Sequence, residues 1–270
     1  MLLKSLILLA AVVRSTDGVS IHYDARGDGE PALVFIHCWT CNRHLWDAQM
    51  SEFSKDHRVV ALDLAGHGDS GMDRKDWTMG AFGEDVKAVV QALGLKRVIL
   101  IGSSMGGPVC LEAARRLGDR VVGIVPVDTL HDVGQRMPAE QVEAATQRMK
   151  ADYKAEVTKF ITQYLFAPST PAAVRERVLA TSTSAPPEIA VAILRSSWQY
   201  DPVPALREIN CPIRAINADR YPTNLAENRK YAPQFDAVIM KGVGHYPMLE
   251  DPRRFNDLLA EALRDLKTRR

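Results

Sequence analysis

The 270-residue sequence lacks several features that would define other classes of protein. Its four cysteines are too few and too scattered for the disulfide scaffold of a small secreted domain. Its 34 basic and 33 acidic residues nearly cancel, and no basic stripe marks a surface for nucleic acid. It has no internal repeat and no low-complexity segment. These absences favour a globular protein with a large core, whose partner is a small molecule and not a nucleic acid.

A metal site also has little support in the sequence. Cys38 and Cys41 form a C-x-x-C pair, a spacing found in redox and zinc sites. No second pair of ligands follows at zinc-finger spacing, so the pattern supplies only half of a site. We interpret the two residues as thiols in a tight loop, and we expect neither a metal nor an organic cofactor.

The N-terminus contains the only apolar run that suggests a targeting segment. Residues 1–13 carry one lysine and a short apolar stretch, similar to a shortened signal peptide. The stretch is too short to span a bilayer comfortably, so we expect no stable membrane insertion. No A-x-A cleavage site is clear, and residues 11–15 fit the start of a strand. Two locations therefore stay open, the cytoplasm and, if the segment is a signal peptide, the periplasm or the exterior.

Short apolar runs recur along the chain and predict strands. Within residues 12–24, the Asp17-Gly18 pair lies between alternating segments, which predicts a β-hairpin. The run Pro31–Ile36 is apolar throughout, as expected for a strand buried on both faces. Similar runs are Arg58–Leu62, Arg97–Ile101, Val121–Val127, Ile213–Ile216 and Ala237–Met240. Helical segments such as Phe82–Leu93 separate them, so we predict an α/β fold with a mostly parallel central sheet and helices on both faces.

The alternation of strands and helices stops between about Leu130 and Leu206. This stretch is rich in alanine, helical in its periodicity and interrupted by prolines, and it contains no convincing strand pattern. We interpret it as a helical cap, residues 131–206, inserted into an α/β core formed by residues 14–130 and 207–270.

Ser104 has the surroundings of a nucleophile. It is the central residue of Gly102–Gly106 (GSSMG), between a predicted strand and a predicted helix. A nucleophile on such a sharp turn needs small neighbours, and the following helix directs its N–H groups at a developing oxyanion. A serine nucleophile also needs a base, and His245 follows the last predicted strand. The sequence therefore predicts acyl transfer with Ser104 as the nucleophile and His245 as the base.

These motifs resemble those of the α/β-hydrolase superfamily, in its esterase, lipase and C–C hydrolase group. The resemblance extends from about Gly18 to Leu266 and is weakest in the predicted cap. The order of nucleophile, acid and histidine along the chain also fits this superfamily. Four motifs carry the resemblance, namely His37–Trp39 (HCW), Asp63–Ser70 (DLAGHGDS), Gly102–Gly107 (GSSMGG) and Gly242–Pro252 (GVGHYPMLEDP).

The resemblance implies an oxyanion hole made of two backbone N–H groups. One belongs to Met105, which follows the nucleophile, and the other to Trp39, which follows the position of the usual His-Gly pair. Cys38 stands where the family has glycine, so its Cβ narrows the site, or shifts the loop if the backbone needs a positive φ. We therefore include Cys38 among the candidate substrate-contacting residues.

The resemblance leaves two candidates for the acid. The family usually places it after the penultimate strand in a G-x-x-D turn, and Asp219 is the natural match, although the turn is one residue shorter with Asn217 in place of glycine. Asparagine tolerates a positive φ, so a tight turn remains feasible. The competitor is Asp128, 24 residues after Ser104, where some members of the superfamily carry their acid. We prefer Asp219 and keep Asp128 as the alternative.

Together these residues predict a serine carboxylesterase that cleaves small or short-chain carboxylic esters through a Ser-His-Asp triad and an acyl-enzyme. A cap over the site excludes very large substrates. Its candidate pocket residues are Met137, Phe166 and Trp198, which serve equally well as the core of the cap itself.

Other functions stay open at this point. A C–C bond hydrolase acting on a β-diketone-type substrate uses the same triad, and a catalytically silent binding protein can have the same fold. A haloalkane dehalogenase or an epoxide hydrolase is disfavoured, because those enzymes use aspartate where this chain has Ser104. The sequence gives no indication of the oligomeric state.

Overall fold

A single eight-stranded sheet forms the centre of the molecule. The computed structural model describes residues 9–268, and within them the strands follow the order β1-β2-β4-β3-β5-β6-β7-β8. Strands β1 and β2 are antiparallel to each other, β2 is antiparallel to β4, and all pairs from β4 to β8 are parallel. The strands are β1 (Leu9–Arg14), β2 (Ser20–Arg26), β3 (Ala32–Ile36), β4 (Val59–Leu62), β5 (Val98–Ser103), β6 (Val121–Val127), β7 (Ile213–Ala218) and β8 (Phe235–Met240). The predicted α/β fold with a mostly parallel sheet is thereby confirmed.

The predicted N-terminal hairpin is also present. Strands β1 and β2 pair in register from Leu9–Ala25 to Arg14–Ser20, and Gly18 in the turn has a φ of 87°. Residues 9–13 of the proposed targeting segment belong to β1, whereas residues 1–8 lie outside the described residues. Between residues 9 and 268, no helix is both long and apolar enough to cross a membrane.

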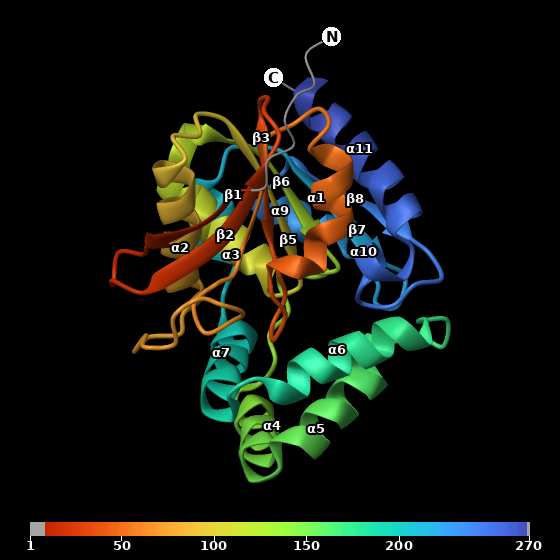
Figure 1. Ribbon diagram of the computed structural model, residues 1–270. Helices are drawn as coiled ribbons and strands as arrows, with labels where there is room; N and C mark the ends of the chain where they lie inside the picture. The colour runs from red at the N-terminus through yellow and green to blue at the C-terminus, as the bar shows by residue number, and fades with distance from the viewer. Residues whose placement is uncertain (1–8, 269–270) are drawn as a thin grey trace.

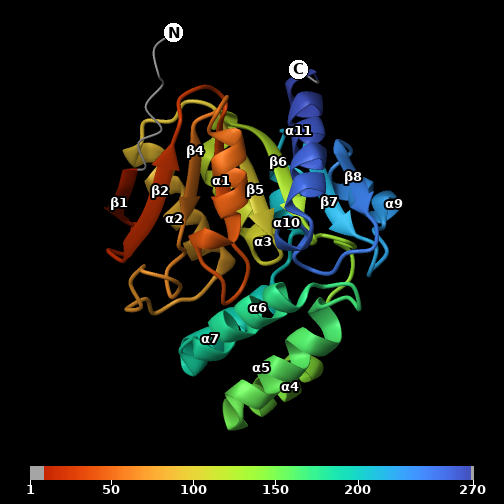
Figure 2. The same cartoon turned by 45° about the vertical axis from the view of Figure 1, so that its right-hand side comes forward.

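Helices cover both faces of the sheet (Figure 2). Helices α1 and α11 lie in contact on one face, and α2 and α3 lie in contact on the other. The strands between them are buried throughout, because each is apolar on both faces. The helices of the core are α1 (Asp47–Phe53), α2 (Met79–Ala92), α3 (Gly106–Leu117), α8 (Val203–Glu208), α9 (Leu225–Tyr231), α10 (Pro247–Glu250) and α11 (Pro252–Thr268), with 3₁₀ turns at Arg43–Trp46 and Gly118–Arg120.

Four helices between β6 and β7 form a separate layer beyond one end of the sheet (Figure 1). We call residues 139–199 the helical insertion. In it α4 packs on α5 and α7, and α5 packs on α6. Its helices are α4 (Ala139–Ala151), α5 (Tyr153–Phe160), α6 (Ala172–Ser184) and α7 (Pro187–Gln199), with a π-helical turn at Ile161–Leu165. The insertion lies within residues 131–206, and its action as a cap over a substrate stays a prediction.

Candidate active site

Ser104 occupies a strained turn between β5 and α3. Its φ is 52°, a left-handed value that is uncommon for a residue with a side chain, and its N–H donates to the carbonyl of Val127 at 2.9 Å. Positions 102 and 106, on either side of Ser104, require glycine because other backbone atoms lie too close to each of them to admit a Cβ. A Cβ on Gly102 would lie 2.2 Å from the carbonyl oxygen of Gly106, and one on Gly106 would lie 2.7 Å from that of Ile36. The turn therefore presents Ser104, which is partly exposed, at the end of the sheet.

His245 faces a buried carboxylate that comes from the end of β6. Its Nδ1 lies 2.5 Å from Oδ2 of Asp128, and its backbone N–H donates to the carbonyl of Leu165 at 2.8 Å. The side chains of His245 and Asp128 are 12% and 2% exposed, so water competes little for this contact. Because Nδ1 donates to the carboxylate, Nε2 is the nitrogen that remains free to act as a base.

Asp128 is surrounded by donors. Its Oδ1 accepts from the N–H of Ala218 at 2.9 Å, and Nε2 of His131 lies 3.3 Å from the same oxygen. Burial by itself raises the pKa of this carboxyl, but the imidazoles of His131 and His245 outweigh burial and hold the pKa well below its ordinary 3.8. Asp128 is therefore ionised at neutral pH and can stabilise a positive charge on His245.

The preference for Asp219 is corrected by this geometry. Asp219 is exposed, and its Oδ1 accepts from the backbone N–H of Gly242 at 2.9 Å, so it braces a loop and does not contact the imidazole. The residue two positions before Asp219 shows what this end of β7 contributes to the site instead. Asn217 is fully buried, and its amide accepts from the N–H of Thr129 at 3.2 Å and donates to Oγ1 of Thr223 at 2.9 Å. A side chain of β7 thus supports the backbone of Thr129, next to Asp128.

One cavity of about 270 Å³ brings most of the predicted residues together. Among the described residues, the backbone N–H groups of Met105 and Trp39 donate to no protein acceptor. The indole of Trp39 donates to the carbonyl of Ala190 in α7 at 2.8 Å, which ties this loop to the helical insertion. The cavity is lined by Cys38, Trp39, Ser104, Met105, Pro108, Thr129, Phe160, Leu165, Leu194, Ser197, Trp198, His245 and Tyr246.

Cys38 lies in a tight turn without distorting it. It has no positive φ, whereas Thr40, two residues later, has a φ of 57°. Its Sγ lies 2.6 Å from Sγ of Cys41, and the N–H of Cys41 donates to its carbonyl at 3.1 Å. Burial and the neighbouring thiol raise the pKa of Cys38 well above its usual range, so this thiol is a weak nucleophile at neutral pH. Within residues 9–268, no group of three or more His, Cys, Asp or Glu side chains is arranged to hold a metal ion.

His37 holds the loop that contains Cys38 and Trp39. Its Nδ1–H donates to the carbonyl of Cys38 at 2.8 Å, and its Nε2 accepts from the N–H of Leu64 at 3.0 Å. Complete burial lowers the pKa of His37 to about 4, so the ring is neutral and fixed in one tautomer.

The three side chains predicted from the insertion have different positions. Trp198 lines the cavity with Ser104, but Met137 is 40% exposed and lines two neighbouring cavities instead. Phe166 is corrected to a packing residue, because it is 3% exposed, 6.1 Å from the ring of Tyr246 and beneath the guanidinium of Arg175.

Sequence reasoning missed several residues of the site. Phe160 and Leu165 line the cavity, and His131 and Asn217 surround Asp128. His131 follows Asp128 by three positions, a spacing that carries no motif. The contacts of Asn217 join strands that are distant in sequence, so no local pattern predicts them.

The comparisons with known proteins agree with this fold. The sequence profile of the α/β hydrolase family matches residues 33–258, so the chain belongs to that family. Epoxide hydrolase 3 of Xenopus tropicalis is 32% identical over 117 residues, which are 42% of this chain and 32% of that protein. A bifunctional esterase/perhydrolase, DCH, of Acinetobacter calcoaceticus is 37% identical over 121 residues, 44% of each chain. The chain thus spans about a third of the first relative and less than half of the second.

Solved structures extend the likeness over the whole chain. A thermophilic esterase from Thermogutta terrifontis, solved with malate bound, is 25% identical with a TM-score of 0.83. The match covers 96% of this chain and 100% of that one, so it includes both the sheet and the helical insertion.

Proposed function

We propose that this α/β hydrolase is a serine carboxylesterase that cleaves small or short-chain carboxylic esters. The observation that supports it most directly is the 2.5 Å contact between His245 and the buried carboxylate of Asp128, beside the cavity that contains Ser104. This contact leaves Nε2 of the imidazole as a base within the cavity that Ser104 and His245 both line.

The proposed reaction transfers the acyl group through the serine. His245 accepts the proton of Ser104 Oγ as this oxygen attacks the acyl carbon, and the ionised Asp128 stabilises the imidazolium that forms. The N–H groups of Met105 and Trp39 stabilise the oxyanion, and one such donor contributes about 3 kcal/mol. His245 then returns its proton to the departing alkoxide, and an alcohol leaves. Water, deprotonated by His245, then attacks the acyl carbon of the acyl-enzyme. His245 returns this proton to Ser104 Oγ as the ester bond to the serine breaks, and the carboxylic acid leaves.

Two further observations support esters of small size. A solved esterase structure and an esterase/perhydrolase are among the similar proteins. The residue at the nucleophile position is Ser104, whereas epoxide hydrolases have an aspartate there. The cavity of about 270 Å³ is slightly smaller than typical ligand pockets, whose volumes range from about 300 to 1,000 Å³.

The experiment compares two adjacent serines with p-nitrophenyl butyrate as the substrate. Ser104→Ala should lower kcat by at least about 10³-fold, because no other group at this turn supplies the nucleophile. Ser103→Ala is the matched control: this serine is fully buried at the end of β5 and does not line the cavity, so activity should stay within about threefold.

A fluorophosphonate label, located by mass spectrometry, tests the same serine without a substrate. The proposal requires the label on Ser104 of the wild type and its absence in Ser104→Ala. Full ester hydrolysis by Ser104→Ala, or an unlabelled Ser104 in the folded wild type, would contradict it and favour a catalytically silent binding protein.

A further inference from the structure

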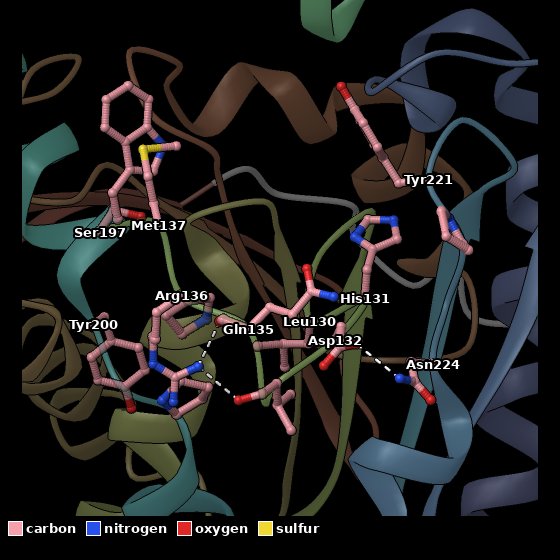
Figure 3. Close-up of a pocket in the computed structure, with 15 residues that line it drawn as sticks. Leu130, His131, Asp132, Gln135, Arg136, Met137, Ser197, Tyr200, Tyr221 and Asn224 are labelled. Atoms are coloured by element: carbon pink, nitrogen blue, oxygen red, sulfur yellow. Dashed lines mark hydrogen bonds between the residues drawn. The ribbon is translucent and has the colours of Figure 1, made fainter. Parts of the chain in front are cut away.

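The cavity of about 270 Å³ that Ser104 lines, which we call the catalytic cavity, lies next to two larger cavities. We call the one of about 630 Å³ the insertion cavity, because α4, α5 and the turn after α5 supply most of its walls. The other, of about 710 Å³, is the loop cavity, formed mainly by the segment after β6 and the segment after β7 (Figure 3). Figure 3 shows its polar side, where Asp132 accepts from the amide of Asn224 at 2.8 Å.

Trp198 lines all three cavities. It shares the wall between the catalytic and insertion cavities with Phe160 and Leu165, and the wall between the catalytic and loop cavities with Pro108 and Ser197. Its indole therefore separates a small chamber from two large ones.

Aromatic contacts hold this wall in place. The rings of Trp198 and Phe160 meet edge to face at 5.7 Å and 69°, and those of Phe160 and Trp39 meet at 6.2 Å and 78°. Such T-shaped pairs are favourable and restrict the orientation of both rings. Because the indole of Trp39 is in turn bonded to the carbonyl of Ala190, the wall is anchored on both the core and the insertion.

We infer that Trp198 is the specificity-determining residue that limits the acyl group to short chains. The inference rests on the proposed esterase function and names its substrate class as esters whose acyl group fits the small chamber, such as acetyl and butyryl esters. The insertion cavity next to it is lined by the apolar side chains of Met137, Met149, Phe160 and Leu165, which suit a longer chain, together with polar and charged ones that include Arg148, Glu156 and Lys159. The indole closes that route.

Removal of the indole should open the route and not merely weaken the fold. A large-to-small substitution in a packed core leaves a void or causes collapse around it. At Trp198 the new space is bordered by existing cavities, so the released volume joins them. A chamber joined to the insertion cavity approaches the upper end of the size range of ligand pockets, which has room for a long acyl chain.

The experiment measures kcat/KM for p-nitrophenyl acetate, butyrate, hexanoate, octanoate and decanoate, all with the same leaving group. In the wild type the value should fall by at least about tenfold from butyrate to octanoate. In Trp198→Ala the ratio of octanoate to butyrate should rise by at least about tenfold, and Trp198→Leu should give an intermediate rise. Circular dichroism and thermal unfolding check the fold of each variant, and Trp198→Leu retains an apolar side chain should the alanine variant not fold.

Tyr221→Ala is the control variant. Tyr221 lines both outer cavities but not the catalytic one, so its removal should leave the chain-length profile of the wild type unchanged. Parallel profiles in the wild type and both Trp198 variants would overturn the inference while leaving the esterase proposal intact. A wild type that already prefers decanoate would overturn both the inference and the short-chain limit of the proposed function, and would leave only ester hydrolysis by Ser104. Absence of hydrolysis with every ester would overturn the proposed function, and the inference with it.

Discussion

The ends of β6 and β7 each carry an aspartate, and the two carboxylates have opposite surroundings. Asp128, after β6, is buried and lies between two histidines and a backbone N–H. Asp219, after β7, is exposed and accepts from one loop amide. The comparison shows that burial and nearby donors distinguish Asp128, the carboxylate that contacts His245, from Asp219. The position of an aspartate relative to a sequence motif does not make this distinction.

Backbone geometry explains why the β6 end holds the carboxylate. Asp128 adopts a φ of 48°, and its N–H donates to the carbonyl of Ile216 in β7 at 2.9 Å. Its side chain in turn accepts from Ala218 at the end of β7. The two strand ends therefore cooperate, because β7 supplies one acceptor for the backbone of Asp128 and one donor for its carboxylate.

The largest expected effect separates the two carboxylates directly. Asp128→Asn should lower kcat for p-nitrophenyl butyrate by about 10³- to 10⁴-fold, because the imidazole loses both its orientation and the charge that stabilises its protonated form. Asp219→Asn, the matched control at the end of β7, should change kcat by less than about threefold, since its contact is with a loop amide. Equal losses in the two variants would remove the distinction between the strand ends.

A second prediction concerns stability in acid. Because the pKa of Asp128 in the folded state lies well below 3.8, its ionised form stabilises the fold above about pH 4, and this contribution is lost as the pH falls further. The free energy of unfolding of the wild type, measured by urea denaturation, should decrease between pH 5 and 3 by about 1 kcal/mol more than that of Asp128→Asn. Asp219→Asn should follow the wild type. An equally steep decrease in Asp128→Asn would show that this carboxylate does not govern acid unfolding.

The smallest expected effect concerns the second imidazole at the β6 end. Nε2 of His131 lies 3.3 Å from Oδ1 of Asp128, so we expect it to position the carboxylate without touching the substrate. His131→Ala should lower kcat by about tenfold or less at an unchanged KM. His131→Gln, which keeps a donor, should recover most of the loss. A change in KM alone, or no recovery by glutamine, would argue against a positioning role.

The regular parts of the molecule were predictable because their signals are local. The apolar run Val98–Ile101, the glycines of the turn and the apolar face of Met105–Leu117 lie next to one another in the chain and define a strand, a turn and a helix. The hairpin around Gly18 follows from an Asp-Gly pair in the same way. Burial on both faces then requires a parallel sheet with helices on both sides.

Contacts between distant segments were predicted less well. Asp219 was the preferred acid because it follows the penultimate strand in a turn that resembles the family motif. Phe166 was a candidate pocket residue because its side chain is large and apolar. In the structure Phe166 packs beneath Arg175, while Phe160, on the other side of the π-helical turn Ile161–Leu165, reaches the cavity. A size-based argument does not reveal which face of the insertion turns toward the sheet.

The sequence by itself determined the fold class and the turn at Ser104, together with a histidine after the last strand at His245. Those features depend on neighbours within a few residues and on the periodicity of apolar side chains. Only the tertiary structure decided that Asp128, 117 positions from His245, is the carboxylate beside its imidazole, and that Trp198 lines the same cavity as Ser104. The physical reason is that both facts depend on the order of strands in the sheet and on the packing of the helical insertion. The side chains involved are distant in sequence and meet only once the chain is folded.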